Sequence, residues 1–511
     1  MEYKMESRKN TFVIITLIIF SGFFVRFFLI NFNEPLTFDA LKYFLFSAEI
    51  STNSKLPVEY TQSSIFWQII LSGFFQIFQF NETLDYMNLQ KILSITISSL
   101  TTIPLYLLLK KFFSKNISLI GILIFIFEPR LIINSQLGIT EPLYLILGII
   151  AFLLILSNER KIILISFISA AFAIITSGEG QMIFYAMTIW YFLKFRKNKK
   201  MFLNYLLCIS FLIIIISPIM FYQYSFLGND GIFGKAVKTI QFHSNEENNP
   251  NRESNNNFFI NGTINFIKYF IWGLFPFMIL LFFPGMFFFF KKLNLEKLLL
   301  LISGILLSIP AIYEYAIPLE DSRYLFMIYP ILIIISLSFI KIIIEKCNHK
   351  KIVYYIIIFG IITSSLLFLN YQYESYNEKF HINEIMKNYL PENAVINQIT
   401  PYSEFIKNKN IPTEWEKLKI MITNHDEKIT SIRISSLNTN IVSFNESDSI
   451  DEFVNNNPNL THLILDEKLS YNSIFSEVFT SNENFDIEKI WDSRESGFIN
   501  HVKLFEIKRN N

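Results

Sequence analysis

The chain has 511 residues, of which 52% are hydrophobic and 56 are phenylalanine, and it contains several apolar runs long enough to cross a bilayer. The net charge of +1 argues against a nucleic-acid partner, which calls for a basic surface. The two cysteines, Cys208 in an apolar run and Cys347 in a basic loop, indicate neither a disulfide framework nor a cysteine metal site. Because each membrane span has to satisfy its backbone hydrogen bonds within itself, the composition predicts an all-α polytopic membrane protein.

The first apolar run, residues 11–30, predicts a transmembrane helix that is retained as an anchor, since no small-residue cleavage site accompanies it. The stretch "NEPLTFDALKYFLFSAEI", residues 33–50, follows directly. It predicts an amphipathic helix that is too short to span a bilayer and therefore lies along the interface. Thr37 or Asp39 can cap its first turn, so a capping role and a chemical role for Asp39 both stay open.

Clusters of lysine and arginine separate the later apolar runs, and basic loops remain in the cytoplasm. With a cytoplasmic N-terminus, their rhythm predicts about eleven transmembrane helices in the plasma membrane and places the chain after Leu369 outside. The predicted spans are residues 11–30, 89–109, 117–134, 140–157, 162–177, 181–194, 201–222, 266–290, 298–316, 324–341 and 352–369.

The apolar run at residues 65–80 does not fit this topology, because as a span it would put every later basic cluster on the wrong side. Its polar residues recur at helical spacing, at Gln68, Ser72, Gln76 and Gln79. This stripe predicts a second interfacial helix within the first outer loop.

Ionisable residues at membrane depth are costly and tend to mark function. They gather at the outer ends of the predicted spans and in the first outer loop: Arg26, Asp39, Glu59, Glu128, Arg130, Glu141, Glu179, Glu314, Glu320, Asp321 and Arg323. Either they form one polar cavity at the outer surface, or the span ends simply carry charges. The six histidines show no paired ligand spacing, and no phosphate-binding glycine loop is present, which argues against a histidine zinc site and nucleotide chemistry.

The stretches "LTFDALKYFLFSAE", "NSQLGITEPLYLILG" and "DSRYLFMIYPILIII" resemble, in their order and spacing, the GT-C glycosyltransferases. These are integral membrane enzymes that take sugar from a lipid carrier. Over residues 1–370 the arrangement most resembles the protein O-mannosyltransferase and aminoarabinose transferase branch, which implies a polyprenyl phosphate sugar as donor. The tryptophan-rich signature of oligosaccharyltransferases is absent, so transfer of a single sugar is expected rather than transfer of a whole oligosaccharide.

In this resemblance the family's first-loop acid falls on Asp39, its later acid on Glu141 and its arginine on Arg323. A guanidinium such as Arg323 or Arg130 could bind the phosphate as its charge grows, and Asp39 could accept the proton of an acceptor hydroxyl. Direct displacement would invert the anomeric centre. Besides Asp39 as base, the residues expected to bind substrate are Arg26, Glu59, Glu128, Arg130, Glu141, Glu179, Arg323 and Tyr324.

The family's acidic pair in the first loop is Asp39-Ala40 here. The donor sugar therefore stays open, as does a divalent metal at the outer acidic cluster, and no cofactor is predicted. The expected partners are the donor, a protein, lipid or glycan acceptor, and the bilayer.

After residue 370 the composition becomes polar and rich in asparagine, and short helix and strand patterns alternate. This predicts a transmembrane catalytic domain over residues 1–369 and a small extracytoplasmic α/β domain over residues 370–511. The second domain could bind the acceptor, support folding or act as a passive cap.

Two other functions stay open. A transporter would show related halves and charges at the membrane midplane, and neither pattern is visible in the sequence. A catalytically inactive membrane scaffold with a binding outer domain is the other alternative.

Overall fold

The computed structural model describes the chain except for residues 1, 37, 57–64, 198, 228–257, 292–293, 317–321, 392–393, 398–410, 424–440, 443–449, 468–478, 480–486 and 509–511. The chain divides into two compact units. Unit 1 consists of Met1–Asn33, Phe46–Gln79 and Tyr86–Phe368, and unit 2 consists of Glu34–Leu45, Phe80–Asp85 and Leu369–Asn511.

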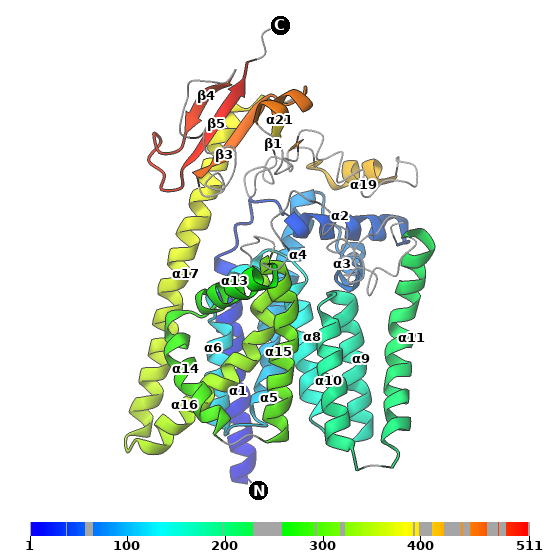
Figure 1. Ribbon diagram of the computed structural model, residues 1–511, viewed down its shortest axis with the longest axis vertical. Helices are drawn as coiled ribbons and strands as arrows, with labels where there is room; N and C mark the ends of the chain where they lie inside the picture. Colours follow the sequence, from blue (N-terminus) through cyan, green and yellow to red (C-terminus); the bar gives the residue numbers. More distant parts are fainter. Residues whose placement is uncertain are drawn as a thin grey trace. The chain divides into compact units, whose positions relative to one another are not determined.

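Unit 1 is a bundle of helices packed around a core of isoleucine, leucine and aromatic side chains (Figure 1). Its helices are α1 (Glu2–Phe28), α3 (Phe66–Ile77), α4 (Thr83–Leu100), α5 (Thr102–Leu109), α6 (Lys115–Ile126), α7 (Pro129–Gln136), α8 (Glu141–Ile155), α9 (Arg160–Thr176), α10 (Gly180–Phe195), α11 (Met201–Leu227), α13 (Phe258–Gly273), α14 (Pro276–Phe290), α15 (Leu295–Ala316), the 3-10 helix η2 (Ser322–Ile328) and α16 (Tyr329–Lys346). In Figure 1 α13 lies across the bundle, whereas most of the helices of unit 1 stand upright. Three helices belong to both units: α4, α2 (Phe38–Asn53) and α17 (Lys350–Tyr389).

Within the described residues, six helices are long and apolar enough to cross a membrane, or eight if two bent pairs each count as one span. These helices fit an integral membrane protein, while the exact number of eleven spans stays a prediction. One bent pair is α6 and α7, which meet at 51°. Pro129 stands at this kink, at the first position of α7.

The predicted single span at residues 266–290 is wrong, because α13 and α14 meet there at 114°. Phe275 has an extended backbone, with φ −66° and ψ 153°, and Pro276 opens α14. A residue before proline is disfavoured in the helical region, so the helix has to end before this point.

The helix α3 is short, as predicted, and its polar stripe is divided. Gln68 and Ser72 are buried together with Trp67, whereas Gln76 and Gln79 are exposed. The first half of the stripe therefore packs into the protein. In α2 only Asp39, Lys42 and residues from Glu49 to Asn53, apart from Ile50, escape burial among the described side chains. Its position at a membrane interface stays a prediction.

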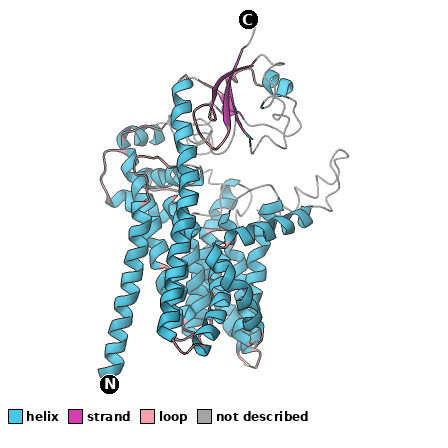
Figure 2. Cartoon of the chain, turned by 90° about the vertical axis from the view of Figure 1, so that its left-hand side faces the viewer, coloured by secondary structure: helices cyan, strands magenta, loops and turns pink. Residues whose placement is uncertain are grey.

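Unit 2 contains a five-stranded sheet with the order β2-β1-β3-β5-β4 (Figure 2, magenta). The inner strands β1 (Ile396–Asn397) and β3 (His462–Asp466) are parallel neighbours, and β3 pairs with β5 (Val502–Ile507) in antiparallel fashion. The edge strands are β2 (Ile441–Val442) and β4 (Ile487–Asp492). The upper part of α17 packs against one face of the sheet, and α21 (Ile450–Asn456) packs against the other.

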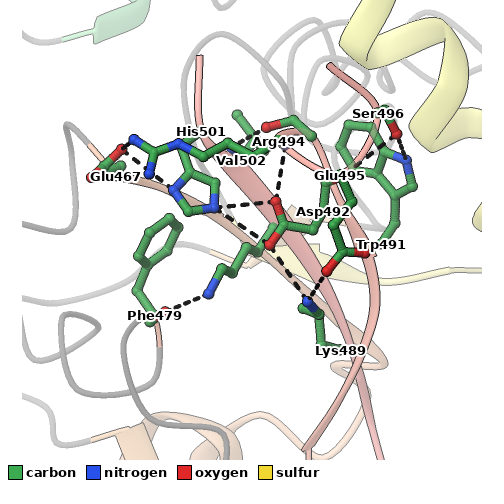
Figure 3. Close-up of polar contacts among 12 residues, drawn as sticks. Glu467, Phe479, Lys489, Trp491, Asp492, Arg494, Glu495, Ser496, His501 and Val502 are labelled. Carbon is green, nitrogen blue, oxygen red and sulfur yellow. Dashed lines mark hydrogen bonds and ion pairs between the residues drawn. The ribbon is translucent and has the colours of Figure 1, made fainter. Parts of the chain in front are cut away.

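A polar cluster fastens the turn between β4 and β5 (Figure 3). His501 Nε2 lies 3.1 Å from Asp492 Oδ1, and its Nδ1 lies 3.4 Å from Glu467 Oε2. Burial alone would raise the pKa of the Asp492 carboxyl, but hydrogen bonds from the Arg494 N–H and from His501, with the charge of Lys489, lower it below its ordinary value. These contacts stabilise the turn.

The contact between α14 and α16 leads to a first prediction. A Cβ on Gly285 would lie 2.4 Å from the carbonyl oxygen of Ile335, which is backbone and cannot move aside. Gly285→Ala should therefore push the two helices apart and destabilise the protein by about 1–3 kcal/mol, the usual range for overpacking. The melting temperature of the solubilised protein measures this effect.

Gly73→Ala is the matched control, because a Cβ at Gly73 of α3 would meet no atom within 4 Å. Its melting temperature should be unchanged or slightly raised, since alanine is the better helix former. Equal melting temperatures for Gly285→Ala and the unsubstituted protein would contradict the close packing of α14 on α16.

Candidate functional site

The break between α6 and α7 carries two charged side chains. Glu128 caps α7, because its Oε2 accepts a hydrogen bond from the Leu131 N–H at 2.7 Å. Pro129 follows at the first helical position, where its missing N–H leaves no hydrogen bond unmade. Glu128 and Arg130 are 1% and 5% exposed, and the Arg130 guanidinium lies over the ring of Phe368 at 5.0 Å.

Tyr329, the first residue of α16, also reaches this break. Its hydroxyl donates to the Gly273 carbonyl at 2.5 Å and lies 3.4 Å from Glu128 Oε1. The carboxylate is thus held between the start of α7 and the start of α16. Tyr329 is a residue that the sequence analysis missed, and no local signal separates it from the other aromatic residues of its apolar run.

Arg26 holds the same break from α1. Its Nη1 donates to the carbonyls of Gly22, at 3.0 Å, and Ile126, at 2.8 Å. The side chain is fully buried, and its Nε and Nη2 have no hydrogen-bond partner among the described residues. Gly22 lets the two helices approach, since a Cβ there would lie 2.0 Å from the Ile126 side chain. The hydrogen bonds of Arg26 link α1 to the end of α6 and so have a structural role. Contact of Arg26 with the substrate stays a prediction.

A second charged pair is less buried. Arg323 of η2 lies 3.5 Å from Glu141, the first residue of α8, measured from Nη1 to Oε1. The two side chains are 25% and 20% exposed. Thr140 Oγ1 lies 3.4 Å from the other carboxylate oxygen of Glu141. A long, partly exposed ion pair contributes little to stability, so its guanidinium can exchange the carboxylate for a stronger anion.

The turn before Glu141 is fixed by side chains of α3 and α4. Gly138 has φ 75°, which favours glycine, and its carbonyl accepts hydrogen bonds from Trp67 Nε1 at 3.1 Å and Gln90 Nε2 at 2.7 Å. Lys91 is buried beside Gln90 and donates to the Asn31 carbonyl at 3.0 Å. The sequence analysis missed these residues, although a lysine just inside a predicted span is a visible signal.

The remaining predicted site residues lie at separate places. Tyr324 packs edge-on against Tyr315, with ring centroids 6.1 Å apart. Glu179 ends the turn before α10, and its charge acts on the buried hydroxyl of Tyr144. Asp39 lies in the first turn of α2, within unit 2. Glu59 lies outside the described residues.

Unit 1 thus brings the predicted residues together in two groups, Arg26 with Glu128 and Arg130, and Glu141 with Arg323. Among the described residues no three His, Cys, Asp or Glu side chains lie close enough together to hold a metal ion.

Comparison with known proteins finds no protein-family model and no curated protein that matches this sequence. Several solved structures do match. The oligosaccharyltransferase of Archaeoglobus fulgidus, in complex with Zn and sulfate, has a TM-score of 0.53 and 12% identity, over 91% of this chain and 69% of that one. AglB of the same organism, in complex with an inhibitory peptide and a dolichol-phosphate, has a TM-score of 0.54 and 11% identity, over 91% and 70%.

ArnT of Cupriavidus metallidurans, bound to undecaprenyl phosphate, covers 97% of this chain and 99% of its own at 10% identity, with a TM-score of 0.48. The fold assignment depends on the first two structures, whose TM-scores exceed 0.5. The chain has the GT-C fold, as the resemblance of its sequence motifs predicts.

Proposed function

We propose that this chain is a membrane glycosyltransferase that moves a single sugar from a polyprenyl phosphate donor to an acceptor hydroxyl on the extracytoplasmic face. The observation that carries the proposal is the Arg323–Glu141 pair, which is partly exposed and whose Nη1 and Oε1 lie 3.5 Å apart. The GT-C fold supports it, since one solved structure of that fold holds a dolichol-phosphate. The apolar helices that surround the pair suit a donor with a lipid tail.

Arg323 would bind the donor phosphate. As the bond between the anomeric carbon and the phosphate oxygen breaks, its electron pair stays on that oxygen and the phosphate gains negative charge. A guanidinium can bind two phosphate oxygens at once and stabilises this charge most in the transition state. Glu141 would keep Arg323 in place before the donor arrives.

Asp39 would act as the general base. The acceptor hydroxyl attacks the anomeric carbon on the side opposite the phosphate, and its proton passes to the Asp39 carboxylate. This displacement inverts the anomeric centre. The solved oligosaccharyltransferase structures include complexes with peptides, which favours a peptide over a lipid or glycan as acceptor.

The test of the function is turnover of the donor. Purified protein in lipid nanodiscs should release polyprenyl phosphate from at least one member of a panel of radiolabelled polyprenyl phosphate sugars. If no donor in the panel is turned over, and proteoliposomes that contain the protein take up solute, the result would contradict this proposal. It would favour the alternative that the protein is a transporter.

Arg323→Lys and Arg323→Ala should both lower turnover by about 10²–10³-fold, the usual loss when one donor to a developing anion is removed. Lysine keeps the charge but cannot reproduce the two parallel hydrogen bonds of the guanidinium. Steady-state rates with the active donor measure the effect. Arg494→Lys is the matched control, because Arg494 also pairs with a glutamate, Glu467, at 2.8 Å, but in the C-terminal sheet. Full turnover by Arg323→Ala would remove Arg323 from the site.

Asp39→Asn keeps the size of the side chain but removes the proton acceptor, so turnover should fall by about 10²–10⁴-fold while the melting temperature barely changes. Asp85→Asn is the control, because Asp85 is likewise an aspartate in the first turn of a helix, α4, and is exposed. If Asp39 serves only the start of its helix, the asparagine variant will turn over donor at the original rate.

A further inference from the structure

The first part of α2 is fastened to the C-terminal part of the chain. Phe44 of α2 is fully buried, and its ring meets the ring of Trp415 edge-on, with centroids 6.1 Å apart and an interplanar angle of 62°. Trp415 is itself only 3% exposed and opens α19 (Trp415–Thr423). Both residues, like Asp39, belong to unit 2.

The backbone strengthens this attachment. The chain just before α4 pairs with the chain just before α19 through an antiparallel bridge between Glu82 and Glu414. The Thr83 N–H donates to the Thr413 carbonyl at 2.8 Å, and the Trp415 N–H donates to the Asn81 carbonyl at 2.9 Å. Two segments more than 300 residues apart in sequence are therefore joined by hydrogen bonds on both sides of Glu414, directly before the Trp415 side chain.

The side chains of α19 show one buried face. Trp415, Leu418 and Ile422 are buried at helical spacing, whereas Ile420 on the opposite face is 55% exposed. The helix is thus anchored along its length, with Trp415 at the end that meets α2. A rigid contact at Phe44, little more than one helical turn from Asp39, restricts how far the carboxylate can move.

We infer that Trp415 is a positioning residue for Asp39: it fixes α2 through Phe44, so the C-terminal domain takes part in the reaction by placing the proposed base. This inference depends on the proposed function of Asp39. It assigns the domain a role distinct from that of a passive cap. Because a displacement of about 1 Å can lower a rate about 10²-fold, loss of this contact should be visible in turnover.

The first test measures the attachment without using activity. In the full-length protein, Trp415→Ala should speed hydrogen exchange of the backbone amides in Phe38–Leu45, and Ile420→Ala on the same helix should not. Thr83→Pro is a second variant, which removes the N–H bonded to Thr413 at the first position of α4, where proline is tolerated. It keeps the test valid if Trp415→Ala folds poorly. Unchanged exchange in both variants would overturn the inference.

The second test asks whether Trp415 acts through Asp39. Trp415→Ala should lower donor turnover about 10²-fold, and Trp415→Phe, which keeps a ring for Phe44, should restore most of it. In the Asp39→Asn background, Trp415→Ala should cause no further loss, because the group that it positions is already absent.

If the fold losses in donor turnover of the two single variants multiply in the double variant, Trp415 does not act through Asp39. That result would overturn the inference without contradicting Asp39 as the base. Turnover at the original rate in Asp39→Asn would instead overturn the proposed base, and the inference with it. The two failures are therefore distinguishable.

Discussion

A break in a helix inside an apolar bundle leaves backbone groups that only the protein can satisfy. At the break between α6 and α7 these partners come from three directions. Arg26 of α1 donates to the Ile126 carbonyl, Ser365 of α17 donates to the Phe127 carbonyl, and Glu128 accepts from the Leu131 N–H. The break thus connects α1 and α17, which come from the beginning and the end of the sequence of unit 1. The positions of Arg130 and of the turn before α8 depend on this connection.

This constraint separates the charged residues into two kinds. Glu128 is buried and held by α7 and Tyr329, so removing one of these partners would leave the buried carboxyl short of a hydrogen bond. Arg323 and Glu141 are partly exposed, and a partly exposed ion pair contributes little to stability. For this reason the proposed mechanism places the substrate phosphate at Arg323.

Unit 2 is assembled from three pieces of sequence, and this bears on how an acceptor would be handled. Its sheet is held to α17 by an apolar cluster and by Glu378, whose Oε2 accepts a hydrogen bond from the Asn500 side chain at 2.7 Å. Its other pieces carry Asp39 and the strand-like segment before α4. A domain built in this way can couple the binding of an acceptor to the placement of the base, since both would involve the same compact unit.

The sequence by itself determined the helical membrane class and the small α/β pattern after residue 370, because run length and local periodicity encode them. Only the tertiary structure decided that Gln68 and Ser72 face the protein and that Arg323 meets Glu141. It also decided that Asp39 shares a unit with Trp415. Each of these outcomes depends on contacts between residues far apart in the chain, which local patterns do not record.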